Sequence, residues 1–169
     1  MYALLMLLAC VLTADGSVIF LQDGFLVNPI MRNTGSPIVH TAIVLYDEDK
    51  PYVYEATVPV VRRMPLDAYY RLLDDKSGKP FNIKRGFKWY VVQPCIPYTS
   101  QQLTSMKQYA RSQLGRPYML RGWWKNREVK GIFCSQYVGN CIEKSGRIVS
   151  ANFKESPGSL FKKLKGLYK

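Results

Sequence analysis

Short runs of β-branched and aromatic residues dominate the first half of the chain and predict extended strands. Four such runs occur, at residues 16–22, 40–46, 51–61 and 87–93. The second and third runs flank the polar residues 47–50, so we expect them to form an antiparallel hairpin with a four-residue loop. A cluster of turn-forming residues at 33–37 separates the first run from the second.

The rest of the chain follows the three-to-four-residue spacing of amphipathic helices. An apolar stripe predicts a helix over residues 65–74, formed by Leu66, Tyr69, Tyr70 and Leu73. A second helix begins at Thr99, which forms a capping box with Gln102, and ends at Gly115. A third begins near Cys134 and ends at Gly146. Further helices are expected at 24–32 and in the lysine-rich C-terminal segment. Because strands come first and helices later, we expect an α+β domain with an antiparallel sheet packed against helices.

The chain has 169 residues, a length that suits one domain. We expect a single domain over residues 15–169 behind an apolar leader at residues 1–14. The leader resembles the core of a secretory signal, and Leu-Leu-Ala-Cys at its end resembles a lipoprotein cleavage box with Cys10 as acceptor. No basic residues precede it, so two locations stay open: the cell envelope after export, or the cytoplasm with this segment as a buried helix.

Lys and Arg outnumber Asp and Glu by 24 to 12, which gives a net charge of +12. This charge suits an anionic partner, such as an acidic substrate, a cell-wall polymer or a lipid surface, but it also fits a merely solvated basic surface. Because the sequence has no helix-turn-helix, RNA-binding or zinc-finger motif, we expect no specific nucleic acid. No run of 18 apolar residues occurs, so we expect no membrane-spanning helix.

The sequence carries no metal-binding or cofactor-binding motif. His40 is the single histidine, which excludes zinc sites that need two or more. The four cysteines include no Cys-x-x-Cys pair, and Cys134 and Cys141 are too far apart along one helix to form a disulfide. We expect no metal and no cofactor.

Cys134 is the candidate for covalent chemistry. It lies in the first turn of its predicted helix, where the helix dipole and unpaired N–H groups favour a thiolate. A thiolate needs an imidazole to become an acyl-transfer nucleophile, and only His40 can supply one. The predicted hairpin register sets Ala42 opposite Glu55, which makes Glu55 a diagonal neighbour of His40 on the same face. From the residues alone, however, each member also fits a structural role, as Cys141 does in the core.

Two motifs in this order resemble the NlpC/P60 cysteine-peptidase core. The first is Leu-Gly-Arg-Pro-Tyr, ending at Tyr118, and the second is Phe-Cys-Ser-Gln-Tyr, which contains Cys134. In that core the histidine follows the cysteine, whereas here His40 comes first. This order resembles the circularly permuted, papain-like YaeF/YiiX branch, and the match covers most of residues 15–160. The chain departs from that branch at Gly16-Ser17, where the family often has Gly-Asp. This difference lies in a turn and touches none of Cys134, His40 and Glu55.

The resemblance implies a circularly permuted NlpC/P60 papain-like fold with Cys134 as nucleophile, His40 as base and Glu55 as third member. It implies a position beside the nucleophile for Tyr118, where its hydroxyl would assist the oxyanion site. Residues that would line the oxyanion site or the substrate groove are Ser135, Trp123 and Trp124.

The expected activity is thiol-dependent hydrolysis of an amide bond in a peptide, a cell-wall peptide or an N-acyl compound. Two alternatives remain open at this stage. The same Cys-His pair suits acyl transfer or thioester hydrolysis on lipid-derived acyl groups, and a degenerate site would leave a non-catalytic basic binding module.

Overall fold

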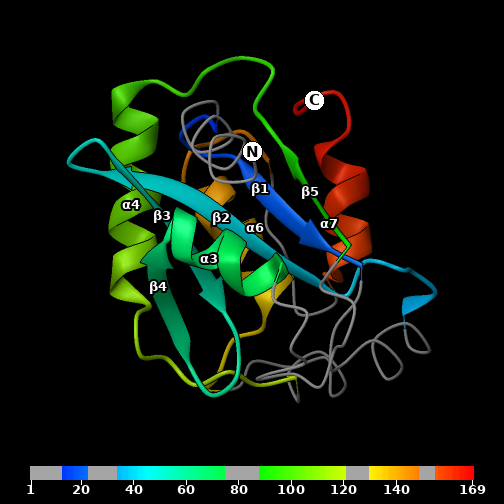
Figure 1. Ribbon diagram of the computed structural model, residues 1–169. Coiled ribbons are helices and arrows are strands. Elements are labelled where there is room, and N and C mark those ends of the chain that lie inside the picture. Colours follow the sequence, from blue (N-terminus) through cyan, green and yellow to red (C-terminus); the bar gives the residue numbers. More distant parts are fainter. Residues whose placement is uncertain (1–12, 23–33, 75–87, 121–129, 149–154) are drawn as a thin grey trace.

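The computed structural model describes residues 13–22, 34–74, 88–120, 130–148 and 155–169 (Figure 1). Five strands form one antiparallel sheet in the order β4-β3-β2-β1-β5. The strands are β1 (Val18–Leu21), β2 (His40–Asp47), β3 (Lys50–Ala56), β4 (Val61–Pro65) and β5 (Trp89–Val92). The helices are α3 (Leu66–Asp74), α4 (Ser100–Ser112), α6 (Cys134–Glu143) and α7 (Pro157–Leu164).

The two faces of the sheet carry different helices. In Figure 1, α3 crosses in front of the sheet and α6 lies behind it. The α3 face buries a compact apolar cluster, made of Ile19, Leu21, Ala42, Val44, Val53, Leu66, Tyr69, Tyr70 and Leu73. The opposite face buries the larger cluster against α4, α6 and α7, with Phe20, Tyr54, Met106 and Tyr137 among its members. The expected α+β class with an antiparallel sheet packed against helices is confirmed.

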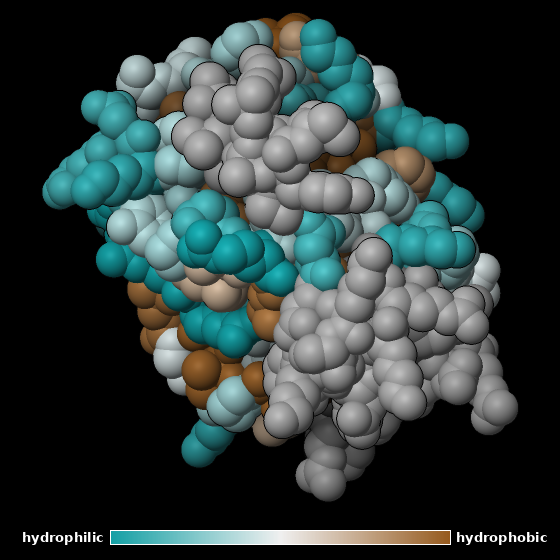
Figure 2. All heavy atoms as spheres, viewed as in Figure 1, coloured by the Kyte–Doolittle hydropathy of each residue, from teal (hydrophilic) through white to brown (hydrophobic). Residues whose placement is uncertain are grey.

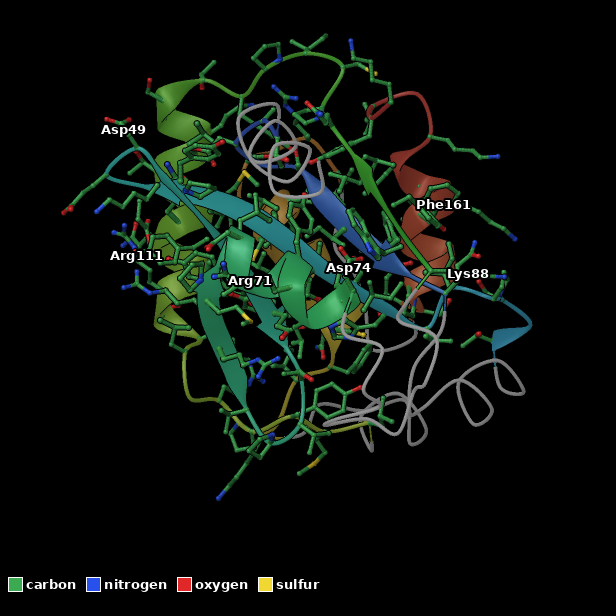
Figure 3. All side chains as sticks on the ribbon, viewed as in Figure 1. Asp49, Arg71, Asp74, Lys88, Arg111 and Phe161 are labelled. Atoms are coloured by element: carbon green, nitrogen blue, oxygen red, sulfur yellow. The ribbon has the colours of Figure 1, made fainter. Side chains whose placement is uncertain are left out.

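Hydrophilic residues cover much of the described surface in Figure 2, and apolar residues show in smaller groups between them. The outer side of α3 follows this pattern, with Arg71 and Asp74 projecting from it in Figure 3. No helix within the described ranges is long and apolar enough to cross a membrane.

The predicted helices agree closely with the structure. Helix α4 carries the expected capping box between Thr99 and Gln102. Helix α6 begins at Cys134, and the C-terminal α7 begins behind a second capping box, formed by Ser156 and Ser159. The helix expected at 24–32 lies outside the described residues.

The strand predicted at 51–61 is in fact two strands. Strand β3 ends at Ala56, and the chain turns through residues 57–60 before β4 begins at Val61. Pro59 lies in this turn, and a proline has no N–H to donate to a sheet ladder. The turn pairs β4 with β3, so that Arg62 lies directly opposite Glu55.

The loop between β2 and β3 is shorter than predicted. Asp47 and Lys50 pair with each other, which leaves only Glu48 and Asp49 in the turn. Both turn residues have positive φ angles, 49° and 62°, as a two-residue hairpin turn requires. The register nevertheless agrees with the prediction, because Tyr46 still lies opposite Pro51. The pairing continues residue by residue from there to Ile43 opposite Tyr54.

Candidate active site

The candidate site lies at the end of the sheet where β2 begins and β3 ends. His40 is the first residue of β2, and Glu55 is the penultimate residue of β3, on the face that α3 covers. Cys134 is the first residue of α6, on the opposite face. The cysteine and the histidine therefore come from opposite sides of the sheet and approach each other at the start of β2.

His40 and Glu55 form a short hydrogen bond. The ring Nε2 lies 2.7 Å from Oε2 of the carboxylate, across the diagonal that the hairpin register predicts. The Glu55 side chain is only 3% exposed, whereas His40 keeps 17% exposure. Since Glu55 uses Nε2, Nδ1 is the ring nitrogen left for Cys134.

Cys134 is buried at 2% exposure and contacts two candidate partners. Its side chain lies close enough to His40 and to the Tyr118 hydroxyl to raise the pKa of both groups. Phe133 precedes the helix, and no side chain among the described residues caps this helix start. The N–H groups of the first turn, including that of Cys134 itself, thus have no side-chain cap from the described part of the chain.

Tyr118 reaches the sulfur because two segments approach each other closely. Its N–H donates to the Pro59 carbonyl at 2.8 Å, and its strand-like segment bridges to Ile132. Gly131 makes this approach possible, since a Cβ there would lie 2.3 Å from the Met119 Cβ and 2.8 Å from the Pro117 carbonyl. The glycine just before the nucleophile helix is therefore needed for steric reasons.

The electrostatics of the site favour a protonated His40. Burial by itself would lower the pKa of His40, but the charge and hydrogen bond of Cys134, joined by those of Glu55, raise it to about 10. Burial would raise the pKa of Glu55, yet His40 and Arg62 together hold it below its usual value. Burial and the neighbouring sulfur raise the pKa of Tyr118, which keeps its hydroxyl protonated and able to donate.

The single histidine makes this ionisation directly measurable. We expect the imidazole signal in ¹H NMR of the untagged protein to titrate with a pKa of about 10. Cys134→Ala removes the thiolate and should lower that pKa by about one pH unit or more, because the imidazolium loses a counter-charge. An imidazole that titrates near 6.5 in the unaltered protein would contradict the ion pair.

Two residues that sequence reasoning missed also bind Glu55. Arg62 donates from Nε at 2.8 Å and lies at 2.6 Å through Nη2, both to Oε1. The Tyr69 hydroxyl donates to Oε2 at 3.1 Å. A turn recognised after Ala56 in the sequence would have predicted a second hairpin, in which Arg62 lies opposite Glu55. Tyr69 was expected to be buried, but the apolar stripe of the helix does not predict the hydrogen-bond partner of its hydroxyl.

Other predicted site residues have different outcomes. The fully buried Ser135 hydroxyl donates to the Glu155 carbonyl at 2.6 Å, which connects α6 to the segment before α7, and its place at the oxyanion or substrate site stays a prediction. Trp123 and Trp124 lie outside the described residues. Cys141 is buried in the core as expected, and burial raises the pKa of its thiol.

A family profile described as "permuted papain-like amidase enzyme, YaeF/YiiX, C92 family" matches residues 12–157. The chain belongs to this family. The predicted fold family is therefore confirmed, and the family is one of permuted papain-like amidase enzymes. Membership favours an enzyme over the non-catalytic binding module.

Among solved structures, the chain is similar to the crystal structure of yiiX from Escherichia coli O157:H7, with a TM-score of 0.58 and 24% identity. The match covers 79% of this chain and 66% of the other, so the amidase spans just under two-thirds of that relative's length. At this identity the likeness supports the fold. No curated protein matches the chain significantly.

The yiiX structure is described as that of a metalloprotein. In the ranges that the structure of this amidase describes, no group of three or more His, Cys, Asp or Glu side chains could hold a metal ion. The described residues thus do not fit a metal centre of that kind, and we derive no step through a metal.

Proposed function

We propose that this amidase hydrolyses an amide bond in a peptide, a cell-wall peptide or an N-acyl compound, with Cys134, His40 and Glu55 as its reactive set. The observation that carries the proposal is the alignment of three side chains: His40 hydrogen-bonds to Glu55 at 2.7 Å, and Cys134 interacts with the same ring closely enough to raise its pKa. A nucleophile, a base and a group that orients the base are the parts that acyl transfer requires.

Acylation begins when the Cys134 thiolate attacks the amide carbonyl carbon. The new C–S bond moves the carbonyl electron pair onto oxygen, and the Tyr118 hydroxyl and the Cys134 N–H can donate to that oxyanion. As the intermediate collapses, the C–N bond breaks, and Nδ1 of the His40 imidazolium passes its proton to the leaving nitrogen. The products are a free amine, a thioester on Cys134 and a neutral imidazole.

Deacylation uses His40 as a base. Its Nδ1 removes a proton from water while the water oxygen attacks the thioester carbon. Breaking the C–S bond then releases a carboxylic acid and restores the thiolate beside the imidazolium. An alcohol or amine in place of water would give acyl transfer, so measuring free acid against acylated acceptor distinguishes hydrolysis from the lipid-directed alternative.

Alkylation by iodoacetamide tests the proposal without a known substrate. We expect Cys134 to react at neutral pH faster than the exposed Cys95, because the neighbouring His40 can take up the proton of its thiol during the attack. His40→Ala should slow alkylation of Cys134 and leave that of Cys95 unchanged, as peptide mass analysis of each site would reveal. If Cys134 reacts no faster than Cys95, and His40→Ala changes neither rate, the proposed function is wrong.

A further inference from the structure

Two groups beside the reactive set have no part in the steps above, and both bind Glu55. Arg62 approaches Oε1 with two of its nitrogens, at 2.8 and 2.6 Å. Tyr69 donates to Oε2 at 3.1 Å, the same oxygen that faces His40. The Arg62 side chain is 39% exposed, whereas that of Glu55 is 3% exposed. Water therefore solvates the guanidinium, while the carboxylate is largely excluded from water.

His40 loses its positive charge during the reaction, and Glu55 then loses a cationic partner. In the free enzyme the imidazolium is a counter-charge to the buried carboxylate. After acylation, His40 has lost its proton, and the sulfur is an uncharged thioester. Burying a carboxylate without a cationic partner costs free energy. This cost is relieved if either His40 or Glu55 itself takes up a proton. Either outcome would deprive deacylation of its base.

We propose that Arg62, assisted by Tyr69, keeps Glu55 an ionised hydrogen-bond acceptor while His40 is neutral in the acyl-enzyme. With that carboxylate satisfied, the imidazole keeps its proton on Nε2 towards Glu55, and Nδ1 is free to accept one from water. Arg62 and Tyr69 are positioning residues, since they act on His40 only through Glu55. The inference rests on the proposed function.

The ionisation of Glu55 depends on burial and on charged groups from several neighbouring elements. Burial works against its ionisation, and His40 and Arg62 work in favour of it. Among the described residues that hydrogen-bond to it, Arg62 is the cation that remains when His40 is neutral. The titratable and charged groups facing the His40–Glu55 pair are Arg62 on β4, Tyr69 on α3, Tyr118 before α6 and Cys134 on α6.

The test is an NMR titration of the single imidazole in full-length, untagged Cys134→Ala protein, which lacks the thiolate as the acyl-enzyme does. Adding R62Q should raise the pKa of His40 by about one pH unit, because neutral His40 then faces an uncompensated carboxylate. R62K, which keeps the charge, should titrate close to the parent. Y69F should move the pKa in the same direction as R62Q but less.

Arg63 offers a matched control on the same strand. It is 44% exposed and lies 2.7 Å from a different buried carboxylate, Asp47, on the other face. R63Q should leave the His40 titration unchanged. The inference is overturned if R62Q and R63Q give the same titration. Should R62Q fail to fold, an unchanged titration in Y69F overturns it equally.

The outcome separates this inference from the proposed function. If Cys134→Ala keeps amidase activity, the proposed function fails. If that variant is inactive but R62Q titrates like R63Q, only the role of Arg62 and Tyr69 fails. On p-nitrophenyl acetate, R62Q in the otherwise unaltered enzyme should shift the limb of the steady-state pH profile that reports neutral His40 to higher pH.

Discussion

Cys134→Ala is expected to lower amide hydrolysis by about 10⁴-fold or more, the largest effect of any single change in this protein. Without the sulfur no thioester forms, and His40 loses the group with which it exchanges a proton. The alanine fits the space of a small buried side chain, so we expect the variant to fold, which thermal unfolding checks. Hydrolysis is measured on N-acyl and peptide substrates, with mass analysis to detect the acyl-enzyme of the unaltered protein.

Cys141→Ala provides the control. Both thiols lie on α6 and are buried, but Cys141 is two turns further along, in the core. We expect Cys141→Ala to lower stability by about 1 kcal/mol, for lost packing, and to keep activity. A Cys134→Ala protein that hydrolyses amides as fast as Cys141→Ala would show that the reaction does not use this nucleophile.

Glu55→Gln is expected to have the second largest effect, on both activity and stability. The substitution preserves shape but removes the charge that orients His40, so we expect activity to fall by about 10² to 10⁴-fold. It also leaves Arg62 beside a neutral amide in place of its 2.6 Å counter-ion. Because Arg62 is 39% exposed and water can solvate it, we expect a loss of about 1–3 kcal/mol, less than for a fully buried pair, seen as a lower midpoint of chemical denaturation.

Asp47→Asn separates the two effects. Asp47 is also a buried carboxylate, and its partners Arg63 and Arg111 lie at 2.7 and 2.5 Å. It lies at the hairpin end of β2, away from the site, and pairs with Arg111 on α4, which is labelled in Figure 3. We expect this variant to lose stability as Glu55→Gln does but to keep its catalytic rate at temperatures where it is folded. Equal losses of activity in the two variants would mean that the Glu55 effect is one of stability alone.

The contrast between Glu55 and Arg62 marks how far the site could be predicted. The hairpin register follows from alternation in two neighbouring strands, so the sequence predicted the diagonal contact of His40 with Glu55, even with the loop length wrong. Arg62 was missed because the turn at residues 57–60 was read as continuous strand. That turn is defined by pairing with β3 and by the Tyr118 contact to Pro59, and neither is visible in a local pattern.

The sequence by itself determined the elements, the nucleophile's position at a helix start and the face shared by His40 and Glu55. These features depend on spacing within a few residues, where helical and strand periods act directly. The tertiary structure decided that Cys134, on a helix behind the sheet, meets His40 at the start of β2, and that Gly131 lets Tyr118 approach the sulfur. Such contacts depend on how layers pack, because side chains distant in sequence come together only when the two apolar clusters are buried.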